Sequence, residues 1–97
     1  TDAKKVLIIG AGSAGRLIIK ELYENQQLQK KPIGIIDDNK NKLGKKIHNI
    51  PVIGTCEDIK RIAKDYEVDE IIFSIANIEN KRKKEINGVY ISEWIYY

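Results

Sequence analysis

Short runs of apolar residues recur along the chain and alternate with segments of helical spacing. The runs lie at residues 6–9, 33–36, 51–53 and 70–75, and each is stopped by glycine or by polar residues. Continuous, partly β-branched runs of this length are typical of strands buried on both faces. Pro32 precedes the second run, in a position that an edge strand tolerates. We therefore predict four strands in these segments.

Two helices are predicted between these strands, because their apolar residues return every three or four positions. The first covers residues 16–23 and ends at the polar stretch 25–27. The second follows Thr55 and Asp58, whose spacing is that of a capping box, and ends near Tyr66.

The remaining segments are polar or ambiguous. Residues 40–50 are rich in lysine and predict a loop. We expect Asn77 to cap a helix that runs through residues 81–85. The Asn-Gly pair that follows either stops this helix or turns the chain into a last short strand at residues 89–91.

This alternation of strands and helices predicts an α/β, Rossmann-like three-layer fold with a mostly parallel sheet of 4–5 strands. The 97 residues, 42% of them hydrophobic and 32% charged, suit one globular domain over residues 1–97. A net charge of +3 is too mild to indicate nucleic-acid binding. No apolar run approaches the roughly 20 residues of a membrane span, so we expect no membrane contact by this segment. Because the chain begins with Thr1 and contains no Met, we expect it to be a piece of a longer protein.

A glycine-rich string links the first predicted strand to the first helix. Gly10 permits a tight turn off the strand, Gly12 leaves room for a diphosphate, and Gly15 allows close packing of helix on strand. The free N–H groups at the start of the helix then face the phosphates. Alternatively, the glycines only form a tight turn. The candidate phosphate-binding residues are Gly10, Gly12, Ser13, Ala14, Gly15 and Arg16.

Two acidic residues end the second predicted strand. Asp37 follows Gly15 by about 20 residues, which is where Rossmann domains place the carboxylate that binds the adenosine ribose. A carboxylate there repels a 2′-phosphate and so favours NAD over NADP. Asp38 is the rival for this role, since one residue of strand register decides between them. The alternative is that the Asp-Asp-Asn cluster only forms a turn.

Basic residues gather in two places. The first group lies in the predicted loop at residues 40–50 and is typical of a solvated loop. The alternative is that it contacts an additional phosphate, as on coenzyme A or in a nucleotide sugar. We expect the second group, at residues 81–84, to be a solvated face or a contact to a missing domain rather than a nucleic-acid site. The first group consists of Lys40, Lys42, Lys45 and Lys46.

Catalytic machinery is not predicted. His48 and Cys56, the single histidine and cysteine, have no partner in the sequence that indicates base or nucleophile chemistry. One cysteine also excludes a multi-cysteine zinc site, and no other metal site is predicted. No tyrosine is followed four residues later by lysine, the pair that short-chain dehydrogenases use.

Residues 6–16, 34–39, 42–54 and 68–73 together resemble the nucleotide-binding domain of CapD-like, membrane-anchored nucleoside-diphosphate-sugar epimerase/dehydratases of capsular polysaccharide biosynthesis. The resemblance implies that Gly10, Gly12, Gly15 and Asp37 line a nucleotide site. It also implies that catalysis belongs to an NAD-dependent dehydratase domain absent from this chain. From the resemblance we expect this chain to be cytoplasmic, in a parent protein anchored to the inner face of the cell membrane. After Glu85 the sequence departs from the family pattern.

We thus expect a small-molecule nucleotide as ligand, NAD first, with a nucleotide sugar or coenzyme A as alternatives. Further expected partners are the missing catalytic domain and a second copy of the chain, which apolar sheet edges and the aromatic tail at residues 94–97 weakly favour. Two other families offer alternative functions. Redox-responsive transcriptional repressors have an NADH-sensing core of similar segment order, but they need a winged-helix domain that these residues do not include. A coenzyme-A-binding domain would explain the lysine-rich loop.

Overall fold

The computed structural model describes residues 3–76, 83–86 and 89–96, and from Ser74 onwards the backbone alone. Short 3₁₀ turns at Gln26–Leu28, Lys40–Lys42 and Cys56–Asp58 join some of the elements. The helices and strands are β1 (Lys4–Ile9), α1 (Ser13–Glu24), β2 (Lys30–Ile36), β3 (Lys46–Ile47), β4 (Ile50–Gly54), α2 (Ile59–Asp65), β5 (Glu70–Ala76), β6 (Lys83–Ile86) and β7 (Val89–Tyr96).

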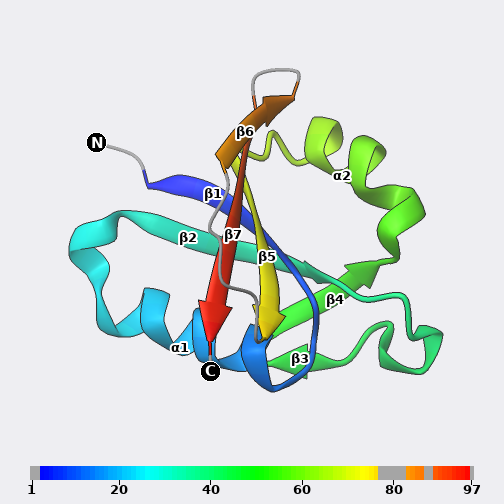
Figure 1. The fold of residues 1–97 in the computed structure, drawn as a ribbon. Coiled ribbons are helices and arrows are strands. Elements are labelled where there is room, and N and C mark those ends of the chain that lie inside the picture. The colour runs from blue at the N-terminus through cyan, green and yellow to red at the C-terminus, as the bar shows by residue number, and fades with distance from the viewer. Residues whose placement is uncertain (1–2, 77–82, 87–88, 97) are drawn as a thin grey trace.

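The strands form one sheet in the order β3-β4-β2-β1-β5-β7-β6 (Figure 1). The five inner strands, from β4 to β7, are mutually parallel, and β3 and β6 are antiparallel to their neighbours at the two edges. This arrangement confirms the predicted Rossmann-like fold with a mostly parallel sheet. The two short edge strands are additional to the 4–5 strands predicted.

The helices cover opposite faces of the sheet, which makes the three predicted layers. Val6 and Ile8 of β1 lie in the core cluster on the α1 side, whereas Leu7 belongs to the cluster on the α2 side. Alternate residues of β1 therefore face different helices, and this is why its apolar run is continuous rather than alternating. Each such buried side chain contributes roughly 1.5–3 kcal/mol. The helical partners are Ile18, Ile19 and Leu22 of α1 and Ile62 of α2.

The predicted helix through residues 81–85 is wrong where the structure describes it. Lys83–Ile86 form strand β6, which pairs antiparallel with β7, while Asn77 and residues 81–82 lie outside the described residues. The Asn-Gly pair is a strong hairpin signal, and the β-branched and aromatic residues of β7 favour a strand. Pairing with β7 overrides the helical preference of the lysine-rich segment. The predicted strand at 89–91 is confirmed but is longer, Val89–Tyr96.

Pro32 lies in β2, which is an inner strand, so its interpretation as an edge proline is wrong. The structure accommodates it at a register shift, because Val6 pairs with Pro32 and Leu7 with Gly34. Proline is tolerated at such bulges, since no ladder hydrogen bond is required of its nitrogen there.

The predicted capping box at the start of the second helical region is confirmed. The Thr55 N–H donates to Asp58 Oδ2 at 2.9 Å. The chain then forms one 3₁₀ turn before α2 begins at Ile59. These contacts fix the carboxyl end of β4, which lies beside that of β2.

Candidate functional site

The glycine-rich loop lies at the carboxyl end of β1, the middle strand of the parallel sheet. Strand β1 lies between β2 on one side and β5 on the other, so the order of the strands reverses direction at β1. Ligands of open α/β sheets bind in the crevice at such a reversal. Gly10 has φ +112°, a conformation that side chains rarely adopt, and its N–H donates to the Ile36 carbonyl at 2.7 Å. The tight turn predicted for Gly10 is therefore present.

Gly12 and Gly15 differ in what surrounds them. Gly12 has an ordinary extended backbone, and a Cβ added there meets no atom within 4 Å. Gly15 is buried inside α1, consistent with the close packing predicted for it. The first turn of α1 contains no acidic residue, and no side chain caps it. The positive end of the helix therefore opens onto free space.

Asp37 joins the end of β2 to the glycine loop. Its Oδ2 accepts a hydrogen bond from the Ala11 N–H and its Oδ1 from the Asn39 N–H, each at 2.8 Å. The Asn39 hydrogen bond, helped by that of Ala11 and by nearby Lys42, outweighs partial burial and lowers the pKa of Asp37. The carboxylate is therefore ionised at neutral pH and borders the loop.

Asp38 faces another part of the molecule. Its Oδ1 accepts a hydrogen bond from the Cys56 N–H at 2.9 Å and so ties the end of β2 to the turn before α2. Of the two rivals, Asp37 is the one in contact with the glycine loop. That it binds a ribose remains a prediction.

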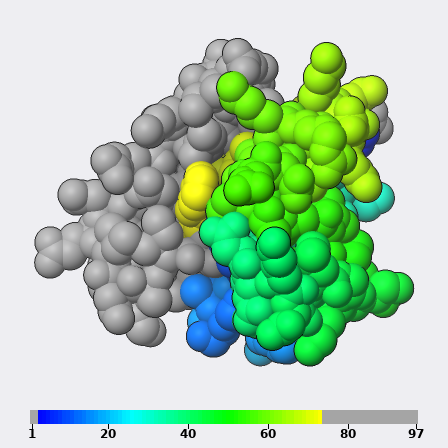
Figure 2. Space-filling model, turned by 90° about the vertical axis from the view of Figure 1, so that its right-hand side faces the viewer, coloured from blue at the N-terminus to red at the C-terminus, as the bar shows by residue number. Residues whose placement is uncertain are grey.

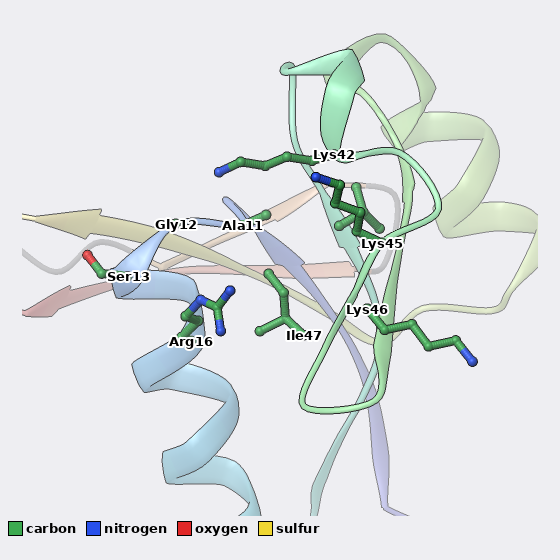
Figure 3. Close-up of a pocket in the computed structure, with 9 residues that line it drawn as sticks. Ala11, Gly12, Ser13, Arg16, Lys42, Lys45, Lys46 and Ile47 are labelled. Atoms are coloured by element: carbon green, nitrogen blue, oxygen red, sulfur yellow. The ribbon is translucent and has the colours of Figure 1, made fainter.

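A cavity of about 320 Å³ opens beside the loop, on the α1 side of the sheet (Figure 3). It brings together residues from two distant parts of the sequence. Figure 2 shows the green segment that supplies one wall lying against the blue residues near the N-terminus. Of the predicted lysine cluster, all members except Lys40 line the cavity. The lining residues are Ala11, Gly12, Ser13, Arg16, Lys42, Lys45, Lys46, Ile47 and Val52.

The outer wall is a hairpin that the sequence analysis missed. Ile47 of β3 pairs with Ile50 of β4, and the two residues between them, His48 and Asn49, have φ of 49° and 72°. Two positive φ values are those of a type I′ turn, for which Asn in a two-residue connection is a sequence signal. The Tyr23 hydroxyl of α1 donates to the His48 carbonyl at 3.1 Å. The hairpin is therefore fastened to the last turn of α1.

The remaining chemistry-bearing groups lie apart from the loop. Cys56 is an exposed residue. Its thiol is nevertheless partly shielded from water and lies near Asp38, and both effects raise its pKa. Because the thiolate is the reactive form, Cys56 is a poor nucleophile. Within residues 3–76, 83–86 and 89–96 no group of three potential metal ligands occurs. No helix in the same ranges has the length and apolar character needed to span a membrane.

Fold and site together define a Rossmann-like nucleotide-binding domain. Residues 2–90 match the model of the CoA-binding domain family, and the chain belongs to that family. It is 34% identical over 89 residues to the capsular polysaccharide biosynthesis protein CapD of Staphylococcus aureus. It is 32% identical over 88 residues to the probable polysaccharide biosynthesis protein EpsC of Bacillus subtilis (strain 168). These comparisons confirm the resemblance to the CapD-like family.

The matches cover only part of each relative. They include 91% of this chain but 15% of CapD and 14% of EpsC, so the chain spans about one-seventh of these proteins. The domain is therefore related to polysaccharide biosynthesis proteins, whereas their activities as whole proteins do not transfer directly.

Solved structures show the same fold. UDP-D-quinovosamine 4-dehydrogenase from Vibrio fischeri is 31% identical, with a TM-score of 0.64 over 76% of this chain and 57% of its own. RSP in complex with β-NADH is 25% identical, with a TM-score of 0.65 over 79% of this chain and 36% of its own. RSP as a Rex-family repressor aligns over 97% of this chain and 54% of its own, with a TM-score of 0.73, and at 20% identity it shows the fold alone.

Proposed function

We propose that this chain is the nucleotide-binding domain of a nucleoside-diphosphate-sugar epimerase or dehydratase of surface polysaccharide biosynthesis. It binds a nucleotide through its diphosphate at the glycine loop, with NAD(H) as the reference ligand. The observation that carries the proposal is the open space over Gly12, where an added Cβ meets nothing within 4 Å at the start of α1.

The physical reason is that backbone N–H groups at the start of α1 present donors and a partial positive charge to that space. A diphosphate reaches them because Gly12 has no side chain. On the β2 side, the ionised Asp37 borders the same loop, where a ribose hydroxyl can donate to its remaining acceptor positions.

The proposal assigns no catalytic step to this chain. Catalysis would be performed by a further domain of the parent protein, and this domain would hold its nucleotide on the cytoplasmic side of the membrane. We also propose three partners for this segment: the catalytic domain, the nucleotide and a second copy of the chain. Neither nucleic acid nor the membrane would contact it.

Calorimetric titration of the chain with NAD⁺, NADH, a uridine-diphosphate sugar and coenzyme A tests the proposal. We expect at least one of them to bind at a single site and to raise the melting temperature. A ligand at 100 times its dissociation constant adds about 2.7 kcal/mol to the free energy of unfolding. Absence of binding by all four would refute the proposal.

A second candidate is the NADH-sensing core of a redox-responsive repressor, which the likeness to NADH-bound RSP favours. Both candidates bind NAD(H), so titration alone does not separate them. The sequence that flanks this domain in the parent protein separates the two candidates. A winged-helix domain upstream would favour the repressor, and a dehydratase domain downstream would favour the polysaccharide enzyme.

A further inference from the structure

Positive side chains gather around the cavity from two walls. Arg16 reaches in from the first turn of α1, and Lys42 extends over the loop from the opposite wall, with Lys45 beside it (Figure 3). The ammonium group of Lys46 points away from the loop, so this residue lines the cavity by its stem. No carboxylate is among the lining residues.

These cations are poorly neutralised by the protein itself. Arg16 and Lys45 take part in no ion pair within the described part of the chain, and Lys42 has a single long contact to Asp37, at 4.0 Å. Like charges brought together around a cavity repel one another, and a bound anion relieves that repulsion. A volume of about 320 Å³ is at the lower end of the roughly 300–1,000 Å³ usual for small-molecule sites.

The position of Lys42 connects the cavity with the predicted ribose site. Its Nζ lies 4.0 Å from Asp37 Oδ2, the oxygen that also accepts from the Ala11 N–H. A sugar that donates to Asp37 therefore stands at the rim of the cavity. A phosphate attached to that sugar is within reach of Lys42 and of the cations behind it.

Asp37 opposes such a phosphate less than the sequence suggests. Each carboxylate oxygen already accepts one backbone N–H, and Lys42 lies nearby. This compensation weakens the repulsion on which the preference for NAD over NADP rests.

We propose that the cavity lined by Arg16, Lys42 and Lys45 binds a phosphate group carried by the ribose of the nucleotide. This inference rests on the proposed function and narrows its ligand class. Nucleotides with a ribose phosphate, such as NADP (at the 2′ position) and coenzyme A (at the 3′ position), bind more tightly than their counterparts without it.

Two ligand pairs that differ only by this phosphate test the inference. The chain is titrated calorimetrically with NADP⁺ against NAD⁺, and with coenzyme A against 3′-dephospho-coenzyme A. We expect the phosphorylated member of at least one pair to bind about tenfold more tightly, as a charge-assisted hydrogen bond allows. The pair that shows the preference tells whether the recognised phosphate is at the 2′ or the 3′ position of the ribose. The preference should weaken with rising salt, since Arg16 and Lys45 are exposed and Lys42 is only partly buried.

Variants locate the phosphate. Lys45→Gln and Arg16→Gln should each reduce the preference to about twofold or less. Lys60→Gln removes the same charge from an exposed position on α2, outside the cavity, and should preserve the preference. A loss in Lys60→Gln equal to that in Lys45→Gln would reduce the effect to net charge and overturn the inference.

The other outcomes are also decisive. Equal affinities within both pairs contradict the ribose-phosphate site and leave the diphosphate proposal standing. A preference that persists in both Lys45→Gln and Arg16→Gln places the phosphate elsewhere. If no nucleotide of either pair binds, the inference fails, and the proposed function fails with it only when the uridine-diphosphate sugar does not bind either.

Discussion

The Asp37 carboxylate accepts a hydrogen bond from the Ala11 N–H at 2.8 Å, across the gap between the ends of β2 and β1. This contact makes Asp37 part of the glycine loop's own support. The residue that is predicted to bind the ribose thus also holds the loop that is predicted to bind the diphosphate.

Replacing Asp37 by Asn should therefore destabilise the free protein, by about 1–2 kcal/mol at neutral pH. The amide has one acceptor oxygen, so either the Ala11 or the Asn39 N–H faces an NH₂ group. Denaturant unfolding measures the difference. Asp38→Asn is the control, because its Oδ1 accepts from the Cys56 N–H and the amide of Asn keeps one oxygen for that hydrogen bond.

The effect of Asp37 should depend on pH. The hydrogen bond from Asn39, foremost, holds the folded-state pKa of Asp37 below its ordinary value of about 3.9. Its stabilisation is then fully present above about pH 4 and is lost as the pH falls through the lower, folded-state pKa. Unfolding curves of parent and Asp37→Asn at several pH values should converge at low pH. A constant difference between them from pH 7 to pH 2 would contradict this role.

Tyr23 offers a test of how the hairpin is held. Tyr23→Phe removes the hydroxyl that donates to the His48 carbonyl, which should cost about 0.5–1 kcal/mol, or a few degrees in melting temperature. Tyr66→Phe is a matched control, since Tyr66 is similarly exposed and its hydroxyl makes no hydrogen bond in the described part of the chain. Equal melting temperatures of the two variants would show that the Tyr23 hydroxyl does not help to hold the hairpin.

The sequence predicts those elements whose apolar residues are buried on defined faces. The runs at β1 and β5 and the spacing of Ile18, Ile19 and Leu22 in α1 leave little choice of structure, because the core clusters consist of these residues. The glycine loop follows from the same logic, since Gly10 needs its positive φ.

Prediction fails where pairing between distant segments decides the structure. Strand β3 has two residues and exists because Ile47 pairs with Ile50. Strand β6 exists because β7 offers it a partner, which its lysines do not indicate. The sequence does not predict the cavity for the same reason, because Arg16 and Lys45 come to line one cavity only in the folded chain.

The core assignment of α1 is tested by two neighbouring residues. Ile18 is fully buried, whereas 46% of the adjacent Leu17 is exposed. Ile18→Ala should lower the free energy of unfolding by about 2–5 kcal/mol, and Leu17→Ala by well under half as much. Denaturant unfolding measures both, and comparable losses would contradict the face that α1 presents to the sheet.

Gly12→Val separates binding from folding. The backbone of Gly12 is extended, with φ −86° and ψ −162°, and a Cβ there meets nothing within 4 Å. The variant should therefore fold, and its free energy of unfolding should lie within about 1 kcal/mol of that of the parent. Its isopropyl group, however, fills the place proposed for the diphosphate. We expect the stabilisation of about 2.7 kcal/mol given by nucleotide at 100 times its dissociation constant to disappear.

Leu17→Val controls for Gly12→Val, because it puts the same side chain at an exposed position in the next turn of α1. It should keep the full ligand-induced shift in melting temperature. Binding by Gly12→Val as tight as that of the parent would mean that the diphosphate lies away from the start of α1. In that case the open space over Gly12 would have no part in recognition, since a valine within it would stand directly between the ligand and the helix N–H groups.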